Sequence, residues 1–148
     1  MLVSAFADRS DAVELEQATL EGVSYMFFAP HDPSTAIERV TFWLDDPSMS
    51  TAPSQVEVHP PYDFGGGGPF GRNGNGPTDA WDYDTSRLAD GLHTMTVRVD
   101  LADGTEAVVD TVFYVANGRI SARAATPEPV AEAAPMQLLR TVLATLAE

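Results

Sequence analysis

The fold is decided by one stretch of sequence: HTMTVRVDL at residues 93–101, ADGT at 102–105 and EAVVDTVFYV at 106–115. Apolar and polar side chains alternate along both long runs, which predicts two half-buried β-strands. The Asp103-Gly104 pair between them predicts the tight turn of a β-hairpin. We expect the core face of this hairpin to carry Met95, Val97, Val99, Val109, Phe113 and Val115, and its solvent face to carry Arg98, Asp100 and Asp110.

Shorter runs precede the hairpin. Residues 25–28, YMFF, are almost unbroken in apolar character and predict a central strand. The pair Pro60-Pro61 predicts an edge or a bend, because proline cannot donate to an internal ladder. Further strands are expected at residues 2–6, 13–16, 18–23, 37–46, 56–64 and 80–84.

The run at residues 37–46 has two distinct faces. Val40 and Phe42 fall on one face with Leu44, whereas Trp43 falls on the other with polar neighbours. This pattern is typical of a strand with one face in the core and one in water. We therefore expect Trp43 to face solvent.

The charge is strongly negative. The chain has 148 residues, with 22 acidic side chains against eight basic ones, and a formal net charge of −14. A surface of this kind repels phosphate backbones and anionic lipid, so we expect no nucleic-acid partner and no membrane insertion. Cations and polybasic partners are favoured instead. The absence of Cys removes disulfides and thiolate chemistry.

Consecutive antiparallel runs of this length predict an all-β fold: an immunoglobulin-like antiparallel β-sandwich of about seven strands in residues 1–117. The Ala/Pro/Glu-rich residues 118–134 are interpreted as a linker. Residues 135–148 have apolar side chains at helical spacing and predict one short amphipathic C-terminal helix. This helix would fold back onto the sandwich, dock on a protein partner or a second copy of the chain, or remain frayed. Its anchors for a partner or for self-association would be Leu139, Val142, Leu143 and Leu146.

Several motifs carry a resemblance to a known family. They are FWLDDP at residues 42–47, PYDF at 61–64, LADGLHT at 88–94 and FYVAN at 113–117. Together they resemble bacterial immunoglobulin-like modules of secreted and cell-surface multidomain proteins. The resemblance implies an accessory structural or binding role, an extracellular location and no shared catalytic residues. The Gly-rich stretch at 65–76 looks longer than the usual connection in that family.

The corner at residues 88–94 has a physical account of its own. Gly91 permits a positive φ, Asp90 can hydrogen-bond the backbone of the turn, and Leu88 can anchor the corner in the core.

Acidic residues gather at strand ends, and Ca²⁺ prefers ligands of this type. The candidate metal ligands are Asp45, Asp46, Asp82 and Asp84. No EF-hand loop is present, which favours the interpretation of the same carboxylates as solvated turn residues.

Aromatic side chains offer a second kind of site, because aromatic faces stack on sugars and anchor protein interfaces. The candidates are Trp43, Phe70, Trp81 and Tyr83. The alternative is that these rings pack in the core or at sheet edges.

Catalysis is not expected. His31, His59 and His93 lie far apart in the sequence, no Gly-x-Ser-x-Gly elbow is present, and the Gly-rich run lacks the Lys of a phosphate loop. We predict a non-catalytic structural or protein-interaction module, with a carbohydrate-binding or Ca²⁺-stabilised adhesion module as the alternative. Residues 1–6 lack the features of a secretory signal, so the sequence leaves open a cytoplasmic protein or a segment of a longer one.

Overall fold

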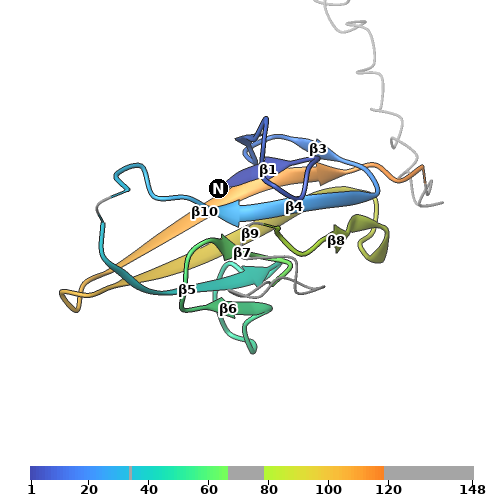
Figure 1. Cartoon of the computed structure of the whole chain (residues 1–148). Helices are drawn as coiled ribbons and strands as arrows, with labels where there is room; N and C mark the ends of the chain where they lie inside the picture. The colour runs from blue at the N-terminus through green and yellow to red at the C-terminus, as the bar shows by residue number, and fades with distance from the viewer. Residues whose placement is uncertain (34, 67–78, 119–148) are drawn as a thin grey trace, which may run out of the picture.

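The computed structural model describes residues 1–33, 35–66 and 79–118. These residues form two β-sheets that face each other around one core (Figure 1). The first sheet has the order β2-β1-β4-β7, with β8 also paired to β4, and the second has the order β3-β10-β9-β5-β6. The strands are β1 (Leu2–Ser4), β2 (Val13–Glu14), β3 (Thr19–Leu20), β4 (Val23–Phe28), β5 (Ile37–Leu44), β6 (Gln55–Glu57), β7 (Tyr62–Asp63), β8 (Tyr83–Asp84), β9 (Gly91–Leu101) and β10 (Glu106–Val115).

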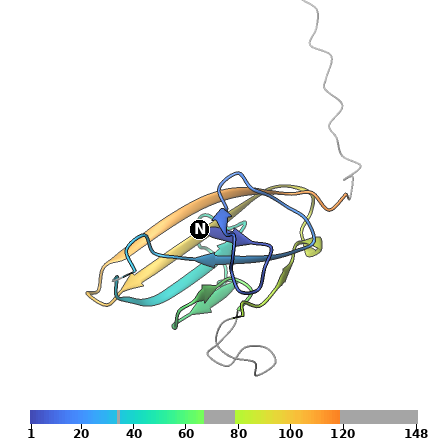
Figure 2. The ribbon, with the colours of Figure 1, turned by 45° about the horizontal axis from the view of Figure 1, so that its top comes forward.

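The predicted hairpin is confirmed. β9 and β10 pair antiparallel from Gly91 opposite Val115 to Asp100 opposite Glu106, and they form the longest ribbon of the molecule (Figure 2). Gly104 adopts a φ of 84°, as the tight turn requires. β5 pairs with the other side of β9, so β9 lies in the middle of the second sheet.

The core is filled from both sheets, and the two sheets therefore form a β-sandwich. The first sheet contributes residues such as Val3 and Met26, and the second contributes Phe42, Val97 and Phe113. The hairpin residues that were expected in the core are buried, with one exception. Val109 is 37% exposed, so its prediction was wrong.

The exposure of Val109 follows from its position along β10. Its side chain lies on the same face as Thr111 and Phe113, but every residue from Glu106 to Asp110 is exposed. On the neighbouring β9, Val97 and Val99 remain buried, so it is the first half of β10 that lies outside the covered part of the second sheet. On the opposite face, Arg98 and Asp100 are half-buried rather than free in solvent.

Ten strand segments stand where a sandwich of about seven strands was expected, and the predicted run at 56–64 is divided between the two sheets. The run that includes Pro60-Pro61 supplies β6 to the edge of the second sheet and β7 to the edge of the first, so the predicted bend is confirmed. The stretch after β1 likewise supplies β2 to the first sheet, and β3 pairs parallel with β10 in the second. β4 lies between β1 and β7, as expected of a central strand.

The corner before β9 is held by side chains. A 3₁₀-helix at Thr85–Arg87 begins at Asp84, whose carboxylate accepts a hydrogen bond from the amide of Ser86. Gly91 has a φ of 132°, which confirms the predicted positive value. Asp90 differs from the prediction, because it accepts a hydrogen bond from the amide of Asn117 at 2.8 Å and so joins the corner to the end of β10.

Within the described ranges, no helix is long and apolar enough to cross a membrane. The predicted linker and terminal helix lie outside the described residues, as does most of the Gly-rich stretch.

Candidate functional site

The candidate metal ligands have separate structural tasks. Asp45 accepts a hydrogen bond from the amide of Thr94 at 3.0 Å, and its other oxygen lies 2.7 Å from Nδ1 of His93. Asp46 accepts hydrogen bonds from the hydroxyls of Ser48 and Thr51 and from the amide of Thr51. These hydrogen bonds, with that from Ser48 contributing most, lower the pKa of Asp46 well below its usual value.

Asp82 and Asp84 lie elsewhere, in the wall of a polar cavity beside Arg87. In the part of the chain that the structure describes, no group of three or more His, Asp or Glu side chains could hold a metal ion. The four predicted ligands are therefore not brought together, and Ca²⁺ binding stays a prediction without geometric support.

Trp43 is buried, with 5% of its surface exposed, so the prediction that it faces solvent was wrong. Its indole Nε1 donates a hydrogen bond to the carbonyl of Thr51 at 3.1 Å, which fixes the turn after β5 against the ring. The Arg98 guanidinium lies 5.7 Å from the ring centroid and covers it from β9. The Thr51 carbonyl and the Arg98 guanidinium come from other segments of the chain. They cover the Trp43 ring, which is therefore buried although it lies on the outer side of β5.

Tyr83 and Trp81 are half-buried. The Tyr83 ring packs 4.9 Å from that of Phe64 and contacts the core. Burial raises the pKa of the Tyr83 phenol, an effect that Arg87 opposes. The remaining candidate anchors, Phe70, Leu139, Val142, Leu143 and Leu146, lie outside the described residues.

The polar cavity around Tyr83 has a volume of about 370 Å³. Its walls combine two aromatic rings, those of Phe64 and Tyr83, with carboxylate, guanidinium and amide groups, a set that can hydrogen-bond hydroxyls while a ring lies beside them. The lining residues include Gln55, Asp82, Tyr83, Asp84 and Arg87.

His93 and Asp45 form a pair that sequence reasoning did not connect. The imidazole is buried and stacks on Phe113, with Nδ1 facing Asp45 and Nε2 at 2.8 Å from the carbonyl oxygen of Ala89. Both ring nitrogens thus face acceptors, and neither faces a nucleophile. The pair joins the end of β5 to the corner before β9. The sequence could have indicated the burial of His93, because His93 alternates in phase with the core residues Met95 and Val97.

The outer side of the second sheet is the most exposed apolar surface of the sandwich. Cross-strand pairing places Val56, Thr41, Arg98 and Val108 in one row, and Leu92 opposite Tyr114 at the other end. We call this surface the open face and define it by its four exposed apolar residues. They are Val56 (44% exposed), Leu92 (59%), Val108 (46%) and Tyr114 (45%).

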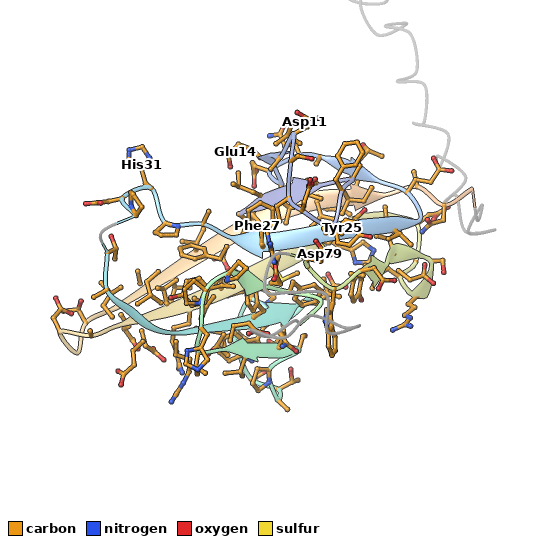
Figure 3. The ribbon with its side chains drawn as sticks, viewed as in Figure 1. Asp11, Glu14, Tyr25, Phe27, His31 and Asp79 are labelled. Carbon is orange, nitrogen blue, oxygen red and sulfur yellow. The ribbon has the colours of Figure 1, made fainter. Side chains whose placement is uncertain are left out.

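The outer side of the first sheet is covered by the chain itself at the Phe27 end of β4, whereas Val23 at the start of β4 is 49% exposed. The Arg9 guanidinium lies 5.9 Å from the Phe27 ring and donates to both carboxylate oxygens of the buried Asp63. Tyr25 and Phe27 project from β4 on this side (Figure 3), where Tyr25 is half-buried and Phe27 buried. The open face thus has four exposed apolar side chains on its strands, whereas on β4 only Val23 is exposed on the outer side. The sequence could have indicated the open face, because Val108, Val112 and Tyr114 occupy outward positions of β10 at which an alternating strand usually has polar residues.

Comparisons with known proteins add little. The sequence matches no family model and no curated protein. The crystal structure of CopC from Methylosinus trichosporium OB3b is similar at 14% sequence identity, over 68% of this chain and 83% of that chain, with a TM-score of 0.33. A likeness this weak carries no argument about function, and the fold rests on the strand pairing described above.

Proposed function

We propose that this chain is a non-catalytic protein-interaction module, a spacer or accessory subunit that binds a protein partner through the open face. The observation that carries the proposal is the exposure of four large apolar side chains on one sheet face, whereas Phe27 on the outer side of the first sheet is covered by Arg9. Large exposed apolar side chains gathered on one face commonly mark an interaction site.

The strand order supports an immunoglobulin-like arrangement. β5, β9 and β10 lie side by side as strands C, F and G do in that fold, while β1 and β4 occupy the places of A and B in the facing sheet. Modules of the family that the sequence resembles occur in secreted and cell-surface proteins, so an extracellular location is part of the proposal.

The charge of the open face defines its partner. Asp100 and Asp110 lie among the apolar residues, and Arg39 and Arg98 both contact Asp100. With a net charge of −14 on the whole chain, we expect a partner that carries an apolar patch within a basic rim. Burial of four exposed side chains would supply the affinity, and the charges would set orientation and association rate.

The absence of catalysis is also part of the proposal. His93 has each ring nitrogen against an acceptor of its own fold, which leaves it no access to a substrate. His31 and His59 are exposed side chains in segments outside the strands.

The experiment is a quantitative affinity capture from the native source with paired variants of the full chain. Leu92→Asp places a charge in the open face, and Val13→Asp makes a similar change at a site of equal exposure, 59%, on the edge of the first sheet. We expect Leu92→Asp to lose the partner and Val13→Asp to retain it. Equal capture by both baits, or loss with Val13→Asp alone, would contradict the proposal.

A carbohydrate-binding module is the second candidate, favoured by the polar cavity around Tyr83. Titration of the full chain with mono- and oligosaccharides tests it, with the backbone amide resonances of the lining residues Gln55 and Asp84 as the readout. Saturable shifts that disappear in Tyr83→Ala and persist in Tyr25→Ala would support a glycan ligand. Their absence across a glycan array would remove this candidate.

In addition to the open face, the helix predicted at 135–148 is proposed as a second element that attaches the chain to a partner. Truncation after Asn117 should release a partner or a second copy while the sandwich stays folded. Retention of every partner by the truncated chain would contradict that role.

A further inference from the structure

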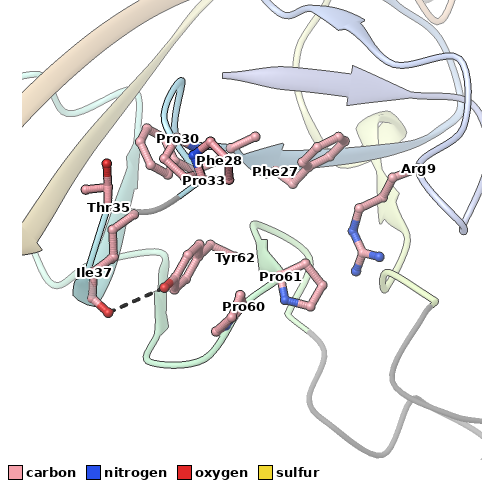
Figure 4. A pocket seen from close by; sticks show the side chains of 11 residues that line it. Arg9, Phe27, Phe28, Pro30, Pro33, Thr35, Ile37, Pro60, Pro61 and Tyr62 are labelled. Atoms are coloured by element: carbon pink, nitrogen blue, oxygen red, sulfur yellow. Dashed lines mark hydrogen bonds between the residues drawn. The ribbon is translucent and has the colours of Figure 1, made fainter.

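An apolar cavity opens at the end of the sandwich where β4 ends and β5 begins (Figure 4). Its volume is about 340 Å³, near the lower end of the range typical of small-molecule sites. β7 and the Pro60-Pro61 pair before it form the opposite wall. The cavity therefore lies away from the open face and serves no part of the function proposed above.

The walls are aromatic rings and prolines. Phe27 and Tyr62 are buried and form the base, Phe28 is half-buried beside them, and prolines such as Pro33 and Pro60 stand exposed at the rim. Proline has no N–H, so these walls offer few hydrogen-bond donors. The Tyr62 hydroxyl is directed to the carbonyl oxygen of Ile37 at 3.5 Å (Figure 4). A ligand with many polar groups would lose its hydration here without gaining partners.

The charges of the lining residues narrow the range of suitable ligands further. Among the described lining residues Arg9 alone is charged, and no carboxylate lines the cavity of a chain whose net charge is −14. The Arg9 guanidinium already lies over the face of Phe27. Because the face of an aromatic ring is electron-rich, a ring from a ligand would complement the same cation.

The cavity has the volume of a small-molecule site, its walls offer few hydrogen-bond donors, and the Arg9 guanidinium lies at one side. We therefore propose that this cavity binds a neutral aromatic ring of phenol or indole size. The ring would stack against Phe28 and the prolines, with its edge toward Tyr62 and its face near Arg9. The same chemistry is carried by a free small molecule and by an exposed Trp or Tyr side chain.

The proposal is tested by titrating the full chain with indole and following backbone amide resonances. We expect saturable shifts at the amides of Phe28, Ile37 and Tyr62, and none of that pattern with N-acetyl-leucinamide, which is apolar but has no ring. N-acetyl-tryptophanamide separates the sources: shifts with indole alone indicate a small molecule, and shifts with both indicate a side chain. No saturable shift with indole, or an equal response to the leucine compound, would overturn the proposal.

A matched pair of variants locates the site. Ala29→Phe fills the cavity from its wall, while Ala36→Phe makes the same change at another exposed alanine that does not line it. Neither substitution removes a core side chain, so both variants should fold. We expect Ala29→Phe to weaken indole binding by at least about tenfold and Ala36→Phe to leave it unchanged. Equal binding by Ala29→Phe and the unaltered chain would show that indole binds elsewhere.

Discussion

Asn117 shows how one side chain can close a sandwich. Its Oδ1 accepts hydrogen bonds from the amide of Gly22 and the hydroxyl of Thr85, its Nδ2 donates to the carbonyl of Thr85, and its own amide donates to Asp90. The start of β4, the 3₁₀-helix and the corner before β9 thus meet at the end of β10. The sequence contained this residue in a recognisable motif, but its partners are set by the tertiary fold.

We predict that Asn117→Ala destabilises the fold by about 1–3 kcal/mol, because it leaves the amide of Gly22 without its acceptor and removes the side-chain link to Thr85, whose hydroxyl keeps only its hydrogen bond to the Gly22 carbonyl. Asn117→Asp should also destabilise, since it places a carboxylate oxygen against the Thr85 carbonyl. Urea unfolding of both variants measures the effect. Unchanged midpoints for both would contradict this account.

Asp46 should make stability depend on acid pH. Its pKa is lowered in the folded state, chiefly by the Ser48 and Thr51 hydrogen bonds, so the ionised form stabilises the fold above the unfolded-state pKa of about 4. That contribution is lost as the pH falls through this value toward the folded-state pKa. We predict that Asp46→Asn lowers stability at neutral pH and makes its decline below about pH 5 shallower. Thermal melts from neutral to acid pH test this, with the exposed Glu38→Gln as control, and parallel curves would refute it.

At the scale of elements, alternation located the hairpin and its turn from sequence. It identified the side of the strand on which each residue lies, but it could not tell how far the facing sheet extends. Val97 and Val109 are cross-strand neighbours on the inner face, yet Val97 is fully buried and Val109 is not. The prediction that Trp43 faces solvent was wrong for the opposite reason, because distant segments of the chain cover its ring.

The difference in burial between Val97 and Val109 allows a test with a matched pair of variants. Val97→Ala should cost about 2–3 kcal/mol through lost burial and a residual cavity. Val109→Ala should cost less than about 1 kcal/mol, since its side chain is already partly in water. Urea denaturation of the two variants decides, and equal losses would contradict the boundary of the core drawn here.

The turn after β1 is tied to β7 by Arg9 and Asp63, whose side chains are 13% and 3% exposed. Burial raises the pKa of Asp63, and Arg9 opposes that rise. We predict that Arg9→Met destabilises the fold by about 3–5 kcal/mol, because a buried carboxylate is left unpaired. With Arg9 removed, the folded-state pKa of Asp63 rises further, so the loss should shrink as the pH falls and the carboxyl is protonated.

The double variant Arg9→Met/Asp63→Leu separates this from a packing effect. It should recover most of the stability at neutral pH, as replacement of a buried ion pair by apolar residues often does. A double variant as unstable as Arg9→Met alone would assign the loss to packing around Arg9.

At the scale of the molecule, the sequence predicted an all-β sandwich and an acidic surface, but not which surface stays open. Coverage of the first sheet depends on Arg9 reaching Phe27 and Asp63, and these contacts join segments far apart in the chain. Of the predicted carboxylate ligands, Asp46 and Asp84 bind groups of their own turns and Asp45 binds His93 and Thr94 on β9. Local patterns cannot reveal such long-range assignments.

The negative surface predicts a salt-dependent association. Opposite charges around an apolar interface accelerate binding and are screened within about 10 Å at 0.1 M salt. We expect the association rate with the captured partner to fall as salt rises, while dissociation changes little. Surface plasmon resonance at graded salt measures both, and a rate that rises with salt would argue against a basic partner.

The central claim, that the open face is where a partner binds, is tested most directly by methyl NMR of the full chain with the captured partner. Resonances of Leu92, Val56 and Val108 should shift or broaden on binding, while those of the equally exposed Val13 should not. Shifts at Val13 with an unchanged open face would contradict the claim.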